Sequence, residues 1–100
     1  MPESKIAPQQ PVVDQAILGR YLRAARIMSG YEKVADLSIA LSRETGVQAS
    51  ERTIYAIERG EQMPTVDIFI AMAVVLRPPG ALSFFMPAIR DDMRIAMIPT

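Results

Sequence analysis

The stretch SERTIYAIERGEQMPT, from Ser50 to Thr65, carries the signals of a short helix with a defined start and a defined stop. Serine is a preferred N-cap residue, because its hydroxyl accepts a hydrogen bond from a free backbone N–H of the first turn. Gly60 is typical of the residue at which a helix stops, and Pro64 follows it. The stretch therefore predicts a helix that begins after Ser50 and ends at Gly60.

This predicted helix has an apolar side and a polar side. Ile54 and Ile57 are three residues apart, so both lie on one side of a helix and are expected to face a core. The residues on the outer side are large and mostly charged: Glu51, Arg52, Tyr55 and Arg59. The function of the chain is expected to depend on what this outer side contacts.

The composition argues against catalysis and against a metal centre. The chain of 100 residues contains no cysteine and no histidine, which removes disulfides, thiolate nucleophiles, imidazole bases and nearly all transition-metal sites. The sequence also lacks a glycine-rich phosphate loop and any catalytic grouping of its other polar residues. We expect a protein that is not an enzyme and that uses no metal and no cofactor.

Length and hydropathy indicate one domain in the cytoplasm. One hundred residues suit a single domain, and a hydrophobic content of 50% is ample for a core. The longest apolar run, Ile68 to Leu76, falls short of the ~20 residues of a membrane span. The N-terminus contains Glu3 and lacks the apolar region of a secretory signal. We expect a cytoplasmic protein with no membrane partner.

The charges balance, because 11 basic and 11 acidic side chains give a formal net charge of zero. This balance weighs against binding to nucleic acid through total charge, but it leaves open a protein that presents basic residues on one face. Most of the basic residues are arginine, which suits bidentate contacts to carboxylates, phosphates and guanine edges.

Periodicity in the rest of the chain predicts an all-α fold. Apolar residues recur at helical spacing, with N-cap residues at Asp14 and Thr65 and glycine stops at Gly30 and Gly46. The expected segments are a flexible N-terminal arm over 1–13, helices over 14–28, 32–44, 66–76 and 81–86, and a C-terminal tail over 87–100. The helical domain itself is expected to span residues 14–86.

The helix over 66–76 is apolar on every side and therefore needs a partner on every side. Its core stripe is expected to be Val66, Phe69, Ile70, Ala73 and Leu76. The positions outside that stripe are also apolar: Ile68, Ala71, Val74 and Val75.

Two partners are available for this second apolar side. The C-terminal tail can fold back over it with Ile89, Ile95, Met97 and Ile98. The favoured alternative is a homodimer, with an expected interface at Ile68, Val75, Phe84 and Phe85.

Two sets of residues follow a known family pattern. The first set runs from the short helix into the next one: Ile54, Ile57, Glu58, Arg59, Gly60, Pro64 and Thr65. The second set has the form L-R-x-x-R ahead of a glycine: Leu22, Arg23, Arg26 and Gly30. With these motifs the chain, over roughly residues 19 to 85, resembles the lambda-repressor-like helix-turn-helix family of the Cro/C1 (xenobiotic response element) type. The resemblance implies a five-helix DNA-binding domain.

The resemblance implies that the helix after Ser50 enters the major groove of double-stranded DNA, and that a homodimer binds a palindromic operator. The residues expected at base edges are Ser50, Glu51, Arg52 and Tyr55. The residues expected at phosphates are Lys33, Arg43 and Arg59. Simpler alternatives stay open: Glu51 can complement the helix dipole, Arg52 can be solvated, and Tyr55 can pack locally.

Arg26 and Glu58 are predicted to form a structural ion pair. In this fold the end of the first helix meets the end of the third, which brings the two side chains together. Removing one partner of a buried pair costs about 3–5 kcal/mol, against about 0–1 kcal/mol for an exposed pair. We assign this pair to the fold and not to recognition.

The connection before the short helix, SRETGVQA, is longer than the tight turn usual in the family. Either the second helix is about a turn longer, or the turn has become a loop. Glu61 and Gln62 also stand where the family commonly has basic residues.

Two functions remain as hypotheses. The first is a DNA-binding transcriptional regulator, a small prokaryotic or phage repressor that occludes a promoter. The second is a protein-binding module, such as an antitoxin or a sequestering partner. A continuous basic strip across Lys33, Arg43, Arg52 and Arg59 would support the first hypothesis. Its interruption by Glu44, Glu51 and Glu61 would support the second.

Overall fold

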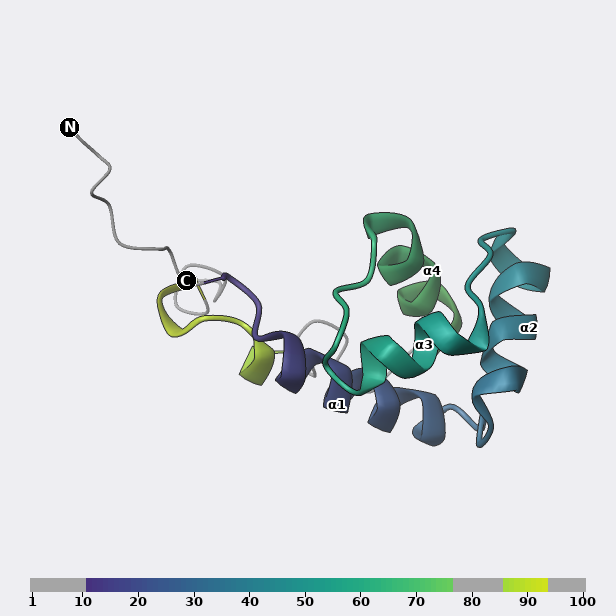
Figure 1. Ribbon diagram of the computed structural model, residues 1–100, viewed down its shortest axis with the longest axis horizontal. Helices are drawn as coiled ribbons and strands as arrows, with labels where there is room; N and C mark the ends of the chain where they lie inside the picture. The colour runs from purple at the N-terminus through teal and green to yellow at the C-terminus, as the bar shows by residue number, and fades with distance from the viewer. Residues whose placement is uncertain (1–10, 77–85, 94–100) are drawn as a thin grey trace.

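The part of the chain that the computed structural model describes, residues 11–76 and 86–93, is built from helices. The helices are α1 (Gln15–Met28), α2 (Val34–Thr45), α3 (Glu51–Glu58) and α4 (Val66–Leu76), followed by a short 3-10 helix η1 (Met86–Ala88) (Figure 1). The predicted all-α class is therefore confirmed. Extended pairing within these residues is limited to one antiparallel bridge, between Val13 and Ile89.

The predicted N-caps begin the helices as expected. Asp14 Oδ1 accepts from Ile17 N at 3.0 Å, Ser50 Oγ accepts from Thr53 N at 3.1 Å, and Thr65 Oγ1 accepts from Ile68 N at 3.2 Å. Each bond satisfies an N–H of the first turn that has no partner inside the helix.

The ends of α2 and α3 agree with the prediction at Gly46 and differ from it by one or two residues elsewhere. Gly46 caps α2 in the left-handed region, with φ of 75°, as a glycine at this position favours. The start of α2 lies at Val34 rather than at position 32, with Lys33 as its N-cap residue. Arg59 is the C-cap of α3, and Gly60 follows it with φ of 77°.

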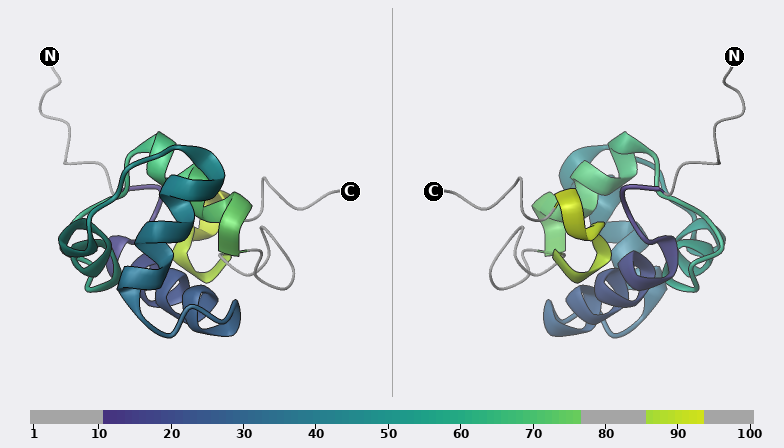
Figure 2. Two further views of the ribbon diagram at one scale, coloured as in Figure 1. Left: turned by 90° about the vertical axis from the view of Figure 1, so that its right-hand side faces the viewer. Right: turned by 90° about the vertical axis from the view of Figure 1, so that its left-hand side faces the viewer.

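A single core joins the helices. α1 packs on α3, α3 packs on α2, and α2 packs on α4, and Figure 2 shows this arrangement from two opposite sides. The largest fully buried side chains come from α2, α3 and α4: Val34, Leu37, Leu41, Ile54, Ile57 and Met72. The hydroxyl of Ser29, at the end of α1, also donates a hydrogen bond to the carbonyl of Leu76, at the end of α4.

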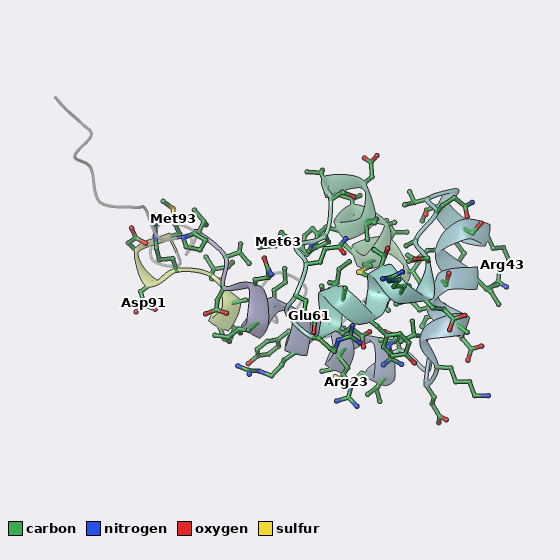
Figure 3. The ribbon with its side chains drawn as sticks, viewed as in Figure 1. Arg23, Arg43, Glu61, Met63, Asp91 and Met93 are labelled. Carbon is green, nitrogen blue, oxygen red and sulfur yellow. The ribbon has the colours of Figure 1, made fainter. Side chains whose placement is uncertain are left out.

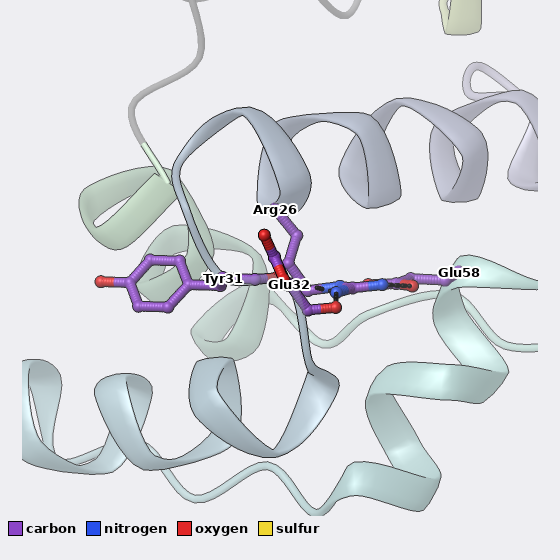
Figure 4. A network of polar contacts seen from close by, with 4 residues as sticks. All are labelled: Arg26, Tyr31, Glu32 and Glu58. Carbon is purple, nitrogen blue, oxygen red and sulfur yellow. Dashed lines mark hydrogen bonds and ion pairs between the residues drawn. The ribbon is translucent and has the colours of Figure 1, made fainter.

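Arg26 and Glu58 form the ion pair that the sequence predicts, and each side chain is only 5% exposed (Figure 4). The contact is bidentate, with Arg26 Nε donating to Glu58 Oε2 at 2.7 Å and Nη2 donating to Oε1 at 3.0 Å. Arg26 Nη1 also donates to the carbonyls of Tyr31 and Glu32, at 2.8 and 2.7 Å. One guanidinium therefore joins α1, the α1–α2 connection and α3.

The geometry of this pair fixes its charge state. The hydrogen bonds to Glu58 raise the pKa of the Arg26 guanidinium above its ordinary value, against the opposing effect of burial. No buried side-chain nitrogen or oxygen in the described residues lacks a hydrogen-bond partner. The pair is thus compensated, as a buried pair must be if it is not to destabilise the fold.

A glycine lets α1 and α3 come into close contact. A Cβ built on Gly19 would lie 2.7 Å from the carbonyl oxygen of Glu58 and closer still to that of Ile57. Just beyond the end of α3, Gln15 Nε2 donates to the carbonyl of Gly60 at 2.8 Å. The C-terminal half of α3 is therefore held along α1 by backbone contact as well as by the ion pair.

The predicted register of α4 is wrong. Its buried residues are Ile68, Ala71, Met72, Val75 and Leu76. Of the predicted core stripe only Leu76 is fully buried, whereas Val66 and Ile70 are exposed. A helix that is apolar all round carries no amphipathic signal, so packing against α2 decides which side faces inward.

The burial of α4 also corrects the predicted dimer interface. Ile68 and Val75 belong to the predicted interface, but both are buried in the core cluster of a single chain, together with residues of the other helices. They are therefore not exposed for contact with a second copy. Phe84 and Phe85 lie outside the described residues.

The segment just before α1 forms backbone hydrogen bonds with the segment at η1. Asp14 N donates to the carbonyl of Ala88 at 2.6 Å, and Arg90 N donates to the carbonyl of Val12 at 2.7 Å. Val12, which belongs to the predicted flexible arm, is thus hydrogen-bonded to the beginning of the predicted tail, and Val13 beside it forms the bridge to Ile89. The rest of the arm (1–10), most of the predicted helix over 81–86, and Ile95, Met97 and Ile98 of the tail lie outside the described residues.

None of the helices in the described ranges has the length and the apolar content needed to cross a membrane.

Replacing Arg26 by methionine is expected to lower the free energy of unfolding by about 3–5 kcal/mol, because the buried Glu58 carboxylate would lose its partner. Denaturant unfolding followed by circular dichroism measures this change. Arg20→Met is the matched control on the exposed side of α1 and should change stability by no more than about 0.5 kcal/mol. A cost for Arg26→Met below about 1 kcal/mol would show that the pair behaves as an exposed one.

Gly19→Ala is expected to destabilise the protein by about 1–3 kcal/mol, because the new methyl group would overlap the α3 backbone. In an open helix interior the same change stabilises by about 0.5–1 kcal/mol, so the sign of the effect is diagnostic. Thermal and denaturant melts of the variant provide the measurement. A stabilised variant would contradict the close contact between α1 and α3.

Candidate nucleic-acid interface

α3 presents an exposed outer side and buries its inner side. Ile54, Ile57 and Glu58 are buried, whereas Glu51 and Arg52 in the first turn are exposed and Tyr55 is 45% exposed. The predicted division of the helix into two sides is confirmed. The loop that precedes α3 therefore does not bury the first turn of this helix.

Ser50 uses its hydroxyl to start α3. Its Oγ accepts from Thr53 N and donates to Thr53 Oγ1, both at 3.1 Å. The side chain predicted to reach a base edge thus has a capping role in the free protein, and a contact to a base would have to share this hydroxyl.

The connection between α2 and α3 is a short loop held by side chains. α2 ends at Thr45 and α3 begins at Glu51, so the loop comprises residues 46–50. Ser38 Oγ donates to the carbonyl of Ala49 at 2.6 Å, and Gln48 Nε2 donates to Ser42 Oγ at 2.9 Å. These bonds connect the loop to α2 and so fix the direction in which α3 leaves it.

Ser38 and Gln48 are positioning residues that the sequence patterns do not identify. Their partners are a backbone carbonyl 11 residues away and a serine hydroxyl six residues away, neither of which belongs to a helix-capping or turn motif. Of the two sequence alternatives for this region, the structure has a 12-residue α2 together with a loop in place of a tight turn.

Arg59 is paired with an acidic residue of the next turn. Its Nε donates to Glu61 Oε2 at 3.1 Å and its Nη2 donates to Glu61 Oε1 at 3.2 Å. The guanidinium carbon also lies 6.0 Å from the centre of the Tyr55 ring, within cation–π range. This predicted phosphate contact therefore has an intramolecular partner, and Figure 3 shows Glu61 beside α3.

The pair shifts the titration of both members. Hydrogen bonding to Arg59 lowers the pKa of the Glu61 carboxyl, and hydrogen bonding to Glu61 raises the pKa of the Arg59 guanidinium. Both side chains are more than half exposed, so salt and solvent screen the interaction.

The other predicted phosphate contacts lie on α2. Arg43, near its end, has a loose ion pair with Glu44 at 3.8 Å and projects away from the body of the molecule (Figure 3). Lys33 is exposed at the start of the helix and makes no capping bond with its side chain. The side chain of Arg52, on α3, makes no hydrogen bond and no ion pair with any part of the chain that the structure describes.

The surface around α3 therefore carries charges of both signs. Arg52 lies next to Glu51 in the chain, Arg59 is bound to Glu61, and Arg43 is close to Glu44. Within residues 11–76 and 86–93, no acidic group of three or more side chains gathers to hold a metal ion. The exposed side chains around α3 can therefore form hydrogen bonds and ion pairs with a partner.

Arg59→Gln is expected to return the pKa of the Glu61 carboxyl to its ordinary value, because it removes the hydrogen bonds that lower that pKa. A carboxyl ¹³C NMR titration measures the change. Since the folded pKa lies below the unfolded one, the stabilising contribution of the pair is present at neutral pH and is lost as the pH falls below the ordinary value of 4.5. Arg43→Gln is the matched control and should leave Glu61 unchanged. A Glu61 that titrates at its ordinary pKa in the unaltered protein would contradict the pair.

Comparisons with known proteins give no relative from which a role for this face can be transferred. A scan against protein-family models, a search of curated proteins and a search of solved structures each found no match.

Proposed function

We propose that the protein is a sequence-specific DNA-binding transcriptional regulator with a lambda-repressor-like helix-turn-helix fold. In this proposal α2 and α3 form the helix-turn-helix, and α3 is the recognition helix. The protein acts as a homodimer on a palindromic operator and represses by occluding a promoter. A small prokaryotic or phage repressor is the class of protein that matches this description.

The observation that carries the proposal is the exposed first turn of α3 on a rigidly held helix. The B-DNA major groove is about 12 Å wide and admits an α-helix, whose N-terminal residues reach base edges. Glu51, Arg52 and Tyr55 occupy that position, and the residues that hold α3 in place lie on its other side.

Arg52 is the residue best suited to read a base. It is exposed and has no partner among the described residues, so binding breaks no existing ion pair. A guanidinium that donates to O6 and N7 of guanine contributes about 1–3 kcal/mol of discrimination against other bases. Glu51 beside it is suited to accept from a cytosine amino group.

The ion pairs on this face are compatible with contacts to phosphate. Arg59 and Glu61 are both exposed, and exposed ion pairs contribute little because water screens them. A phosphate can therefore replace the Glu61 carboxylate as the partner of Arg59. Arg43, with its longer contact to Glu44, can exchange partners in the same way.

A protein-binding module on the same scaffold is the second candidate function, and the alternating charges favour it. Each of three arginines has a glutamate close to it: Arg43 is near Glu44, Arg59 is bound to Glu61, and Arg52 follows Glu51 in the chain. Such a face is suited to a protein partner with complementary charges of both signs. An antitoxin or a sequestering partner would use α3 in this way.

DNA binding is expected to show a linear fall of log K with log salt concentration, with a slope of roughly −0.9 for each phosphate neutralised. Fluorescence anisotropy with duplexes selected from a randomised library measures both affinity and this slope. A slope near zero, with no preference among the selected duplexes, would contradict DNA binding and favour the protein-binding alternative.

Arg52→Ala is expected to lower the preference for the selected duplex over a random one by about 1–3 kcal/mol, because the bidentate base contact is lost. Arg20→Ala is the matched control, since it removes the same charge from an exposed position on α1. Unchanged preference in Arg52→Ala would remove this residue from base recognition.

A further inference from the structure

The guanidinium of Arg59 contacts two other exposed side chains. It donates two hydrogen bonds to the Glu61 carboxylate, at 3.1 and 3.2 Å, and its carbon lies 6.0 Å from the centre of the Tyr55 ring. Tyr55 precedes Arg59 by four residues, the spacing at which neighbouring side chains meet on the surface of a helix. We call these three residues the Tyr55 cluster.

The backbone between Arg59 and Glu61 is packed on α1. The chain turns at Gly60, which has φ of 77°. A Cβ built on Gly60 would lie 2.8 Å from Ala16 Cα, and Gln15 Nε2 donates to the Gly60 carbonyl at 2.8 Å. The turn therefore has little room to move, and it fixes where the Glu61 carboxylate meets the guanidinium.

Tyr55 is supported in a way that the first turn of α3 is not. The side chains of Glu51 and Arg52 form no hydrogen bond and no ion pair within the described residues. Tyr55 is 45% exposed, yet its ring is held by a guanidinium that is itself held. A side chain that is held before binding loses less conformational freedom when a partner arrives, so more of its contact energy appears as affinity.

We propose that Arg59 and Glu61 are positioning residues, which orient the Tyr55 ring for contact with the C5-methyl group of a thymine. The guanidinium lies over the ring, and the rest of the ring's carbon surface is apolar. The thymine methyl is the apolar group that base pairs display in the major groove. This inference deepens the proposed DNA-binding function and rests on it.

The Tyr55 cluster can stay intact while Arg59 also contacts DNA. The two bonds to Glu61 use Nε and Nη2 of Arg59, whereas Nη1 forms no hydrogen bond within the described residues. Nη1 can therefore donate to a phosphate without release of the carboxylate. The expected phosphate contact of Arg59 and its positioning role are thus compatible.

The first test exchanges thymine for uracil, which lacks only the C5-methyl group. Duplexes are selected from a randomised library, each thymine of the selected sequence is replaced in turn, and fluorescence anisotropy measures each affinity. For the unaltered protein, at least one exchange is expected to weaken binding by about 3- to 5-fold, as the loss of one buried methyl group predicts. Tyr55→Ala is expected to remove the effect of that exchange.

The second test measures the same exchange in variants of the two positioning residues. Glu61→Ala and Arg59→Ala are each expected to reduce its effect to below about 2-fold, because the methyl contact is lost when the ring is no longer held. Glu44→Ala is the matched control, since it removes the same charge beside Arg43 and should leave the effect unchanged. A general change in charge alters the affinity for the thymine and the uracil duplex equally. Circular dichroism melts establish that each variant is folded.

Three outcomes would overturn the proposal while leaving DNA binding established. The first is a selected sequence in which no exchange weakens binding, or in which Tyr55→Ala keeps the effect. The second is a Glu61→Ala variant that keeps the full effect, which would show that the ring needs no positioning. The third is a Glu44→Ala variant that loses the effect as completely as Glu61→Ala. If neither the unaltered protein nor any variant binds a selected duplex, the proposed function fails and this inference fails with it.

Discussion

The contact between Arg26 and Glu58 is the interaction on which the arrangement of the helices depends. Both side chains are removed from water, and their charges are compensated by each other and by the carbonyls of Tyr31 and Glu32. A charge buried without a partner is costly, so α1, the α1–α2 connection and α3 can be displaced only together. The close approach of Gly19 to the α3 backbone has the same effect through sterics. The outer side of α3 is exposed in a fixed direction because its inner side is held in these two ways.

Local signals in the sequence predict much of this fold. Asp14, Ser50 and Thr65 act through bonds to backbone groups three residues away, so their capping roles follow from the chain alone. The amphipathic pattern of α3 is also local, and it separates Ile54 and Ile57 from the outer residues correctly. The ion pair spans 32 residues, and its prediction came from the resemblance to a family rather than from periodicity.

The features that sequence reasoning missed depend on tertiary contact. α4 is apolar on every side, so its pattern contains no information on which side faces inward, and contact with α2 decides it. The bond from Ser38 to Ala49 joins residues whose types are common on any surface, and only the folded geometry brings them together. Arg59 and Glu61 are near neighbours in sequence. Their pairing nevertheless requires the turn at Gly60, which brings the two side chains together. The exposed outer side of α3 was thus predictable from the sequence, whereas the bond between Arg59 and Glu61 was not.

The buried and the exposed residues of α3 are different residues, and this separation affects how the sequence of such a protein can change during evolution. In a helix of only eight residues, shape is maintained by Ile54, Ile57 and Glu58, while the exposed positions 51, 52 and 55 bear no part of the core. Mutations at these three positions are therefore expected to be close to neutral for folding. Under the proposed function, selection on target choice could act on them freely, and duplicated copies of the gene could acquire new targets through a few codons while the scaffold is inherited unchanged.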